Sequence, residues 1–292
     1  MSFYAAIKKS AKTALAGRRG AGAVATLLVL GALATLGAMD FFALRMFAPP
    51  PSDYWRSGAV EPTYFLRVFF GQSPQELIIA GLALATYLML LAPLFLGMAR
   101  WHYVLIQGDR PNTGELLHFF RGGRRYGRAV WHNVQLTLRC LGWGIVFLAL
   151  PSGLLSICVR FLLIDGLTRT TRMIASVGIV VAFALLVMAA VLYAIYLGKY
   201  ALSGYLLCES DRISVRQALR TSIRYTKGYR GVKFLFTLSF AGWYLLVPAT
   251  LLVALVFVLT YHMAGETVFA RYLVEKNRAE LSPVTREFGG AA

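Results

Sequence analysis

The sequence predicts an all-α transmembrane helical bundle of about six spans. Of its 292 residues, 58% are hydrophobic and only 15% are charged, which is too little charge for a soluble domain of this size. Several apolar stretches reach the roughly 20 residues that a helix needs to cross a bilayer. The thirty Lys and Arg residues lie mainly between those stretches, as the positive-inside rule describes. We therefore expect the net charge of +17 to face anionic headgroups on the cytoplasmic side, and we expect no nucleic-acid partner.

The first two spans enclose an outward loop. The first span is expected at about 21–42, after a basic N-terminal segment placed in the cytoplasm, and it is too long for a signal peptide. Residues 49–73 begin with three consecutive prolines and carry several aromatic side chains, which suits an outward loop. The second span, about 76–98, leads into an arginine-rich segment that should be cytoplasmic.

The remaining spans leave one choice open. A third apolar run, 129–163, contains Pro151 and should kink or break there. The fourth span, about 173–197, is followed by a second basic segment, which should also be cytoplasmic. The last run, 232–261, is either one long bent span or two helices that meet near Pro248. We favour two, which places both termini in the cytoplasm, whereas five spans would place the C-terminus outside. The chain then forms one transmembrane domain, 1–282, with a flexible tail, 283–292.

An internal duplication is indicated at an offset of about one hundred residues, with units at about 76–163 and 173–261. The paired landmarks keep their order along the chain: Gly97 with Gly198, Thr113 with Ser214, Gly127 with Gly228, Trp143 with Trp243 and Pro151 with Pro248. Two such units would be parallel copies, as in some transporters. Plain duplication of a helical hairpin would give the same pattern.

Each unit should carry a basic amphipathic helix at the level of the headgroups. Ser214 and Gln217 have the spacing of a capping box, and arginines follow at four-residue intervals. Residues 112–115 offer a similar helix start before the other arginine group. The candidate contacts to lipid phosphate or to an acidic membrane partner are Arg121, Arg124, Arg125, Arg128, Arg216, Arg220 and Arg224. Orientation of the protein by general headgroup contact is the simpler reading of both groups.

Arg139 is the best single site candidate, because it lies inside an apolar run. An unpaired charge there is costly, so the side chain should face a partner, water or the interface. Catalytic, metal and cofactor sites are not expected. The three cysteines lie far apart, and the four histidines fall in different segments without ligand spacing. The sequence also has no nucleophile elbow, no P-loop and no paired carboxylates in an apolar region.

The second unit resembles a known membrane family. The resemblance rests on the following residues: Ser214 to Leu219 with Ser222, the Lys227–Gly228 pair, Phe234, and Leu238 to Trp243 with Leu245 and Leu246. In this order they resemble the uncharacterised bacterial family called domain of unknown function 975. The similarity is best over about 200–246 and continues to the end, where Thr260 replaces the proline of the family's Pro-Tyr pair. The resemblance implies a bacterial multi-pass protein of about six spans without an established activity.

We therefore expect a non-enzymatic protein of the bacterial plasma membrane that acts in envelope upkeep or with a membrane protein partner. Two alternatives share the same topology. A small transporter would use Arg139 and the bundle interior as its path. A lipid-binding module would select anionic headgroups through the arginine clusters, with an affinity that falls as salt rises.

Overall fold

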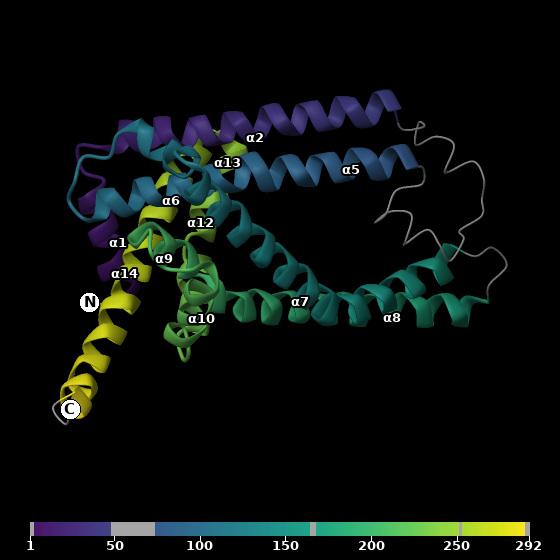
Figure 1. Cartoon of the computed structure of the whole chain (residues 1–292). Coiled ribbons are helices and arrows are strands. Elements are labelled where there is room, and N and C mark those ends of the chain that lie inside the picture. Colours follow the sequence, from purple (N-terminus) through teal and green to yellow (C-terminus); the bar gives the residue numbers. More distant parts are fainter. Residues whose placement is uncertain (1–2, 48–73, 164–167, 251–252, 290–292) are drawn as a thin grey trace. The chain divides into compact units, whose positions relative to one another are not determined.

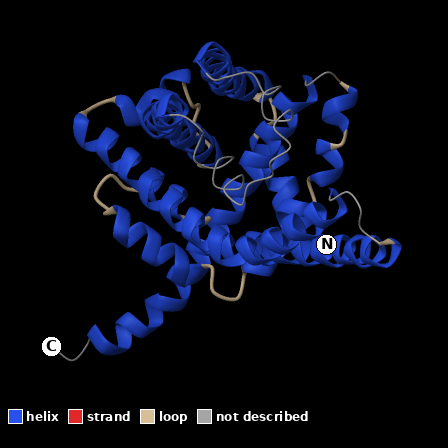
Figure 2. Cartoon of the chain, turned by 90° about the vertical axis from the view of Figure 1, so that its right-hand side faces the viewer, coloured by secondary structure: helices blue, strands red, loops and turns tan. Residues whose placement is uncertain are grey.

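The computed structural model describes residues 3–47, 74–163, 168–250 and 253–289 (Figure 1). Within these ranges all regular elements are helices (Figure 2). They are α1 (Phe3–Ala14), α2 (Arg19–Phe47), α5 (Pro74–Thr86), the π-helix η1 (Tyr87–Leu91), α6 (Ala92–Ile106), the 3-10 helix η2 (Thr113–Phe120), α7 (Gly123–Leu163), α8 (Arg169–Leu197), the 3-10 helix η3 (Gly198–Tyr200), α9 (Ser203–Glu209), α10 (Val215–Tyr225), α11 (Arg230–Leu238), α12 (Ala241–Tyr244), α13 (Leu246–Ala249) and α14 (Val253–Gly289).

Six helical stretches among the described residues are long and apolar enough to cross a membrane. They are Arg19–Ala43, Gly81–Ile106, Gly123–Leu162, Arg169–Glu209, Arg230–Pro248 and Val253–Ala279. Many of their large apolar side chains are exposed, as a lipid-facing surface requires. The prediction of an all-helical protein with six candidate spans is confirmed. The last apolar run is divided in two, because α11 to α13 end at Ala249 and α14 begins at Val253.

Two expected boundaries can be placed on these helices. Helix α7 continues through Pro151 without a break, although proline has no amide hydrogen to donate at that turn. The next residue, Ser152, donates its hydroxyl to the carbonyl of Leu148 at 2.6 Å. The predicted tail, 283–292, begins inside α14, which extends to Gly289. The predicted outward loop, 49–73, lies outside the described residues.

The chain forms two compact units. One consists of Lys9–Asn133 and Val247–Ala264. In it α2 packs beside α5 (Figure 1), and α6 packs closely along η2. The closest approach is at Gly97, where an added Cβ would lie 1.9 Å from the carbonyl oxygen of Leu116. The hydroxyls of Thr26 and Thr260 meet at 2.7 Å, and Trp101 beside them in this core is fully buried.

The other unit consists of Met1–Lys8, Val134–Leu246 and Gly265–Ala292. Its part of α7 runs alongside α8 (Figure 1). Tyr193 on α8 donates its hydroxyl to the carbonyl of Cys140 on α7 at 2.8 Å. An aromatic cluster joins α11 and α14, with Phe236 stacked on Phe269 at 5.5 Å between ring centroids. The ammonium of Lys8 donates to the carbonyl of Ser239 at 2.9 Å. Burial at this position lowers the pKa of Lys8.

Candidate functional site

Helix α10 displays three of the predicted arginines as one exposed row. Arg216, Arg220 and Arg224 are exposed and lie four residues apart, so they share one face of the helix. The opposite face is buried: Val215 is 5% exposed and Leu219 is 2% exposed. That face packs against α9 and η3. Because the apolar face of α10 is covered by protein, the arginine row points away from the unit in a fixed orientation.

The start of α10 has the predicted capping box. The Ser214 hydroxyl accepts from the Gln217 amide at 3.2 Å, and the Gln217 side-chain oxygen accepts from the Ser214 amide at 3.1 Å. Two donors of the first helical turn are thereby satisfied. The helix therefore begins at the residue that the sequence predicts, which fixes the rotation of the arginine row.

A buried hydroxyl connects α10 to the end of α8. Ser222, which is 0% exposed, donates to the carbonyl of Lys199 at 2.8 Å and accepts from the amide of Leu202 at 3.1 Å. Thr226 donates to the same Lys199 carbonyl at 3.3 Å. These bonds satisfy backbone groups in the turn that follows α8. They also hold α10 against the end of a candidate span.

The first arginine group is arranged differently. A helix begins at the predicted position, Thr113, but residues 113–120 form a 3-10 helix and Asn112 provides no side-chain cap. Gly122 has a φ of 100°, a conformation that ends the helix and that glycine adopts readily. Arg121 follows η2, whereas Arg124, Arg125 and Arg128 lie in the first turns of α7. The arginines of this group do not form one helical row.

An ion pair lies on α6 and η2, before the first arginine group. The Nε of Arg100 lies 3.4 Å from Glu115 Oε2, and Glu115 lies within η2. Arg121 and Arg124 are exposed, whereas Arg125 and Arg128 are half-buried. The first group therefore offers fewer exposed arginines than its sequence suggests.

Arg139 lies on α7 beside a second cation, Lys199. The guanidinium of Arg139 is 5.8 Å from the centroid of the Tyr200 ring, and the ammonium of Lys199 is 4.9 Å from the same centroid. Lys199 is only 6% exposed, and its ammonium also lies 3.5 Å from the Tyr196 centroid and 4.5 Å from that of Trp143. Three aromatic rings therefore surround this lysine, as in a cation–π cage.

Neither cation has a carboxylate partner among the residues that the structure describes. The Nη1 of Arg139 is buried, and it has no hydrogen-bond acceptor within the described ranges. Sequence analysis singled out Arg139 as a site candidate but did not relate it to Lys199. The available signal was the run of Tyr196, Lys199 and Tyr200 at the end of the fourth span, where the two rings lie about one helical turn apart and the lysine lies between them.

An ion pair between two candidate spans was not predicted. Lys233 Nζ on α11 lies 2.8 Å from Glu266 Oε1 on α14. The hydroxyl of Thr237 donates to the same oxygen at 2.9 Å. The side chains of Lys233 and Glu266 are 19% and 23% exposed, so water reaches them only in part. Sequence analysis had singled out neither Lys233 nor Glu266 as a site candidate.

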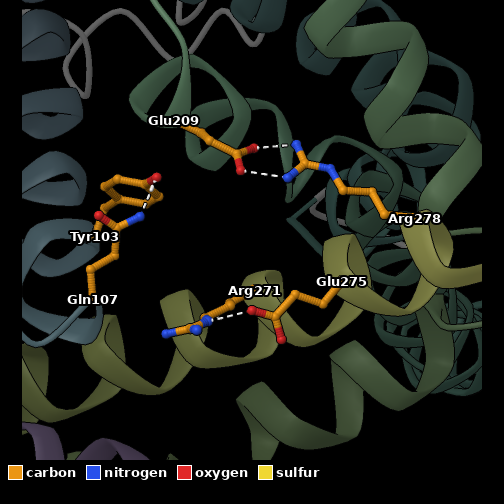
Figure 3. Close-up of polar contacts among 6 residues, drawn as sticks. All are labelled: Tyr103, Gln107, Glu209, Arg271, Glu275 and Arg278. Atoms are coloured by element: carbon orange, nitrogen blue, oxygen red, sulfur yellow. Dashed lines mark hydrogen bonds and ion pairs between the residues drawn. The ribbon is translucent and has the colours of Figure 1, made fainter.

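Figure 3 shows further polar contacts of α9 and α14. Arg278 donates from both terminal nitrogens to Glu209, each at 2.8 Å, and this bidentate pair links α14 to α9. Arg271 and Glu275 pair at 2.6 Å one turn apart on α14. Among the described residues there is no group of three His, Cys, Asp or Glu side chains that could hold a metal ion.

The comparisons with known proteins identify a family but no function. Residues 1–277 match the family described as protein of unknown function (DUF975). No curated protein matches the chain, and neither does any solved structure. The match covers both arginine groups, the Arg139–Lys199 pair and the Lys233–Glu266 pair. Because the match covers almost the whole chain, the protein belongs to the DUF975 family, whose function is unknown.

Proposed function

We propose that this chain is a non-enzymatic multi-pass protein of the bacterial plasma membrane whose basic cytoplasmic surface binds anionic lipid headgroups. The observation that carries the proposal is the row of Arg216, Arg220 and Arg224 on α10, which is exposed while the apolar face of the same helix is buried. Guanidinium groups bind phosphate oxygens strongly, and each basic residue near an anionic leaflet contributes about 1 kcal/mol.

The proposed topology places this row at the cytoplasmic surface. Six spans put both termini, the segment between the second and third spans, and the segment between the fourth and fifth spans on one side. Both of these internal segments are rich in arginine, which favours the cytoplasmic side. We propose that such a surface acts in envelope upkeep or binds an acidic membrane protein partner.

A duplicated origin is part of the proposal. Each unit of the predicted repeat has a span, a short helix and then another span, as in α6, η2 and α7, and in α8, α10 and α11. Gly122 and Gly228, with φ of 100° and 84°, each precede the later span. Gly127, which the sequence had paired with Gly228, instead lies inside α7. The two glycines with positive φ are the better match.

Native mass spectrometry of the protein extracted gently from its membrane would test lipid binding. Arg216→Gln with Arg220→Gln removes two charges from the row, and Arg169→Gln with Arg172→Gln is the matched control at the start of α8. We expect the α10 variant to lose phosphatidylglycerol retention about tenfold relative to the control. Equal retention of phosphatidylcholine and phosphatidylglycerol by the wild type would contradict the proposal.

A second candidate function is a small transporter for an anion, and Arg139 with Lys199 favours it. Both belong to candidate spans, and the buried Nη1 of Arg139 has no acceptor among the described residues. Intramembrane charges often mark a substrate path. In proteoliposomes, substrate-dependent flux that Arg139→Ala abolishes would favour transport. Absence of flux for the anions tested, with wild-type behaviour of Arg139→Ala, would count against it.

A further inference from the structure

A cavity of about 560 Å³ lies in the unit that contains α2 and α6. Its wall includes Gly17 and Arg18 before α2, Trp101 on α6, and Arg110 with Pro111 in the loop that follows α6. Gly17 has a φ of 75°, which suits glycine and lets the chain turn into the first span. The cavity therefore lies where the first candidate span begins and the second one ends.

Arg18 is held in place at the wall of this cavity. Its guanidinium donates to the carbonyls of Gly108 and Asp109, with Nη2 at 3.4 Å from the Gly108 oxygen. These bonds tie the start of α2 to the loop after α6. They keep a permanent positive charge beside the cavity, because arginine stays protonated.

The other polar groups of the wall are also donors. Arg110 is exposed, and within the described ranges its guanidinium has no hydrogen-bond or ion-pair partner. The first amides of α2 have no acceptor earlier in their helix, and the positive end of the helix dipole lies there. None of the residues that line the cavity is acidic.

Trp101 lies against the wall of this cavity. The side chain is 0% exposed, and its indole Nε1 is buried without an acceptor in the described part of the chain. An indole N–H usually finds a partner when it is buried. The cavity wall therefore combines two arginines with the start of a helix and has no acidic residue.

We propose that this cavity binds a phosphate group. A phosphate has several acceptor oxygens and a negative charge, and it suits both the arginines and the start of a helix. The group could come from a lipid headgroup, since the cavity lies at the ends of two spans, or from a soluble phosphate compound. The site is separate from the α10 arginine row and does not depend on it.

The test uses the full-length chain labelled with 5-fluorotryptophan and observed by ¹⁹F NMR. Trp101→Phe assigns the Trp101 signal, and thermal unfolding checks that this variant folds. Inorganic phosphate is titrated into protein in neutral detergent. A parallel arm compares nanodiscs of phosphatidylcholine with nanodiscs that contain phosphatidylglycerol. Arg110→Gln is the test variant, and Arg212→Gln, which changes an exposed arginine outside this cavity, is the control.

A saturable shift of the Trp101 signal by phosphate, weakened about tenfold by Arg110→Gln and unchanged by Arg212→Gln, would support a site for soluble phosphate. A shift seen only with phosphatidylglycerol, and lost in Arg110→Gln, would support a lipid source. A signal that responds to neither probe, or that responds equally in both variants, would overturn the proposal. Arg216→Gln with Arg220→Gln should leave the Trp101 response intact, so the two proposals can fail separately.

Discussion

Lys233 and Glu266 form an ion pair, with Nζ 2.8 Å from Oε1, between two helices that are each long and apolar enough to cross a membrane. The hydroxyl of Thr237 bonds to both partners, because it accepts from Lys233 at 3.0 Å and donates to Glu266 at 2.9 Å. Water reaches both side chains only in part, so each charge depends on the other for much of its solvation. This triad is a polar connection between α11 and α14.

Glu266→Gln should therefore destabilise the protein. The substitution leaves the Lys233 ammonium without its counter-charge, and we expect a loss of about 1–3 kcal/mol in the free energy of unfolding. Glu275→Gln is the matched control, because the Arg271–Glu275 pair is 43% and 60% exposed and should change stability by less than about 0.5 kcal/mol (Figure 3). Unfolding in detergent measures both, and equal losses would contradict the structural role of the Lys233–Glu266 pair.

The sequence predicts the two helices that carry Lys233 and Glu266, but it does not predict the ion pair between them. Hydropathy and length determine the spans, and both can be read from neighbouring residues. The partners Lys233 and Glu266 are 33 positions apart, and their contact depends on how α11 packs against α14. No spacing rule within one helix relates two such residues, so only the tertiary structure reveals the contact.

Gly97→Ala should be strongly destabilising. A Cβ at this position would lie 1.9 Å from the Leu116 carbonyl oxygen and 2.7 Å from its carbon, and backbone atoms cannot move aside as a flexible side chain can. Helix α6 would have to separate from η2, and we expect a loss above about 3 kcal/mol or no folded protein.

Gly81→Ala is the control for this effect. Gly81 lies in α5, and nothing is within 4 Å of a Cβ added there. Alanine favours the helix by up to about 1 kcal/mol relative to glycine. Detergent-solubilised yield and thermal unfolding should therefore separate the two variants, and similar yields and melting temperatures would show that α6 and η2 do not pack this closely.

Local signals explain why the two basic segments were predicted unequally well. The capping box of Ser214 and Gln217 depends on residues three apart, and it is present as predicted. The start at Asn112 looked similar, but no side-chain cap forms there. The position of η2 is set by its close packing on α6 at Gly97. Tertiary packing therefore overrides a weak local signal in the first segment.

Ser222→Ala should weaken the attachment of α10. It removes an acceptor from the Leu202 amide and a donor to the Lys199 carbonyl, and an unsatisfied buried amide costs about 1–3 kcal/mol. Ser176→Ala is the control, because that hydroxyl is exposed and bonds only to Arg172 O in its own helix. Hydrogen exchange should rise in α10 for Ser222→Ala alone, and unchanged protection would show that the buried hydroxyl does not hold this helix.

Lys199 and Tyr196 should be energetically coupled. The ammonium lies 3.5 Å from the ring centroid and is almost fully buried, so the cation–π attraction is little screened by water and should contribute about 1–2 kcal/mol. A double-mutant cycle of Lys199→Met and Tyr196→Leu, measured by unfolding in detergent, isolates this contribution from the packing of each side chain. The same cycle with Lys227→Met, an exposed lysine, should give no coupling. Zero coupling at Lys199 as well would mean that the rings only fill space around its alkyl chain, and the ammonium would then have to be stabilised by water or by a bound anion.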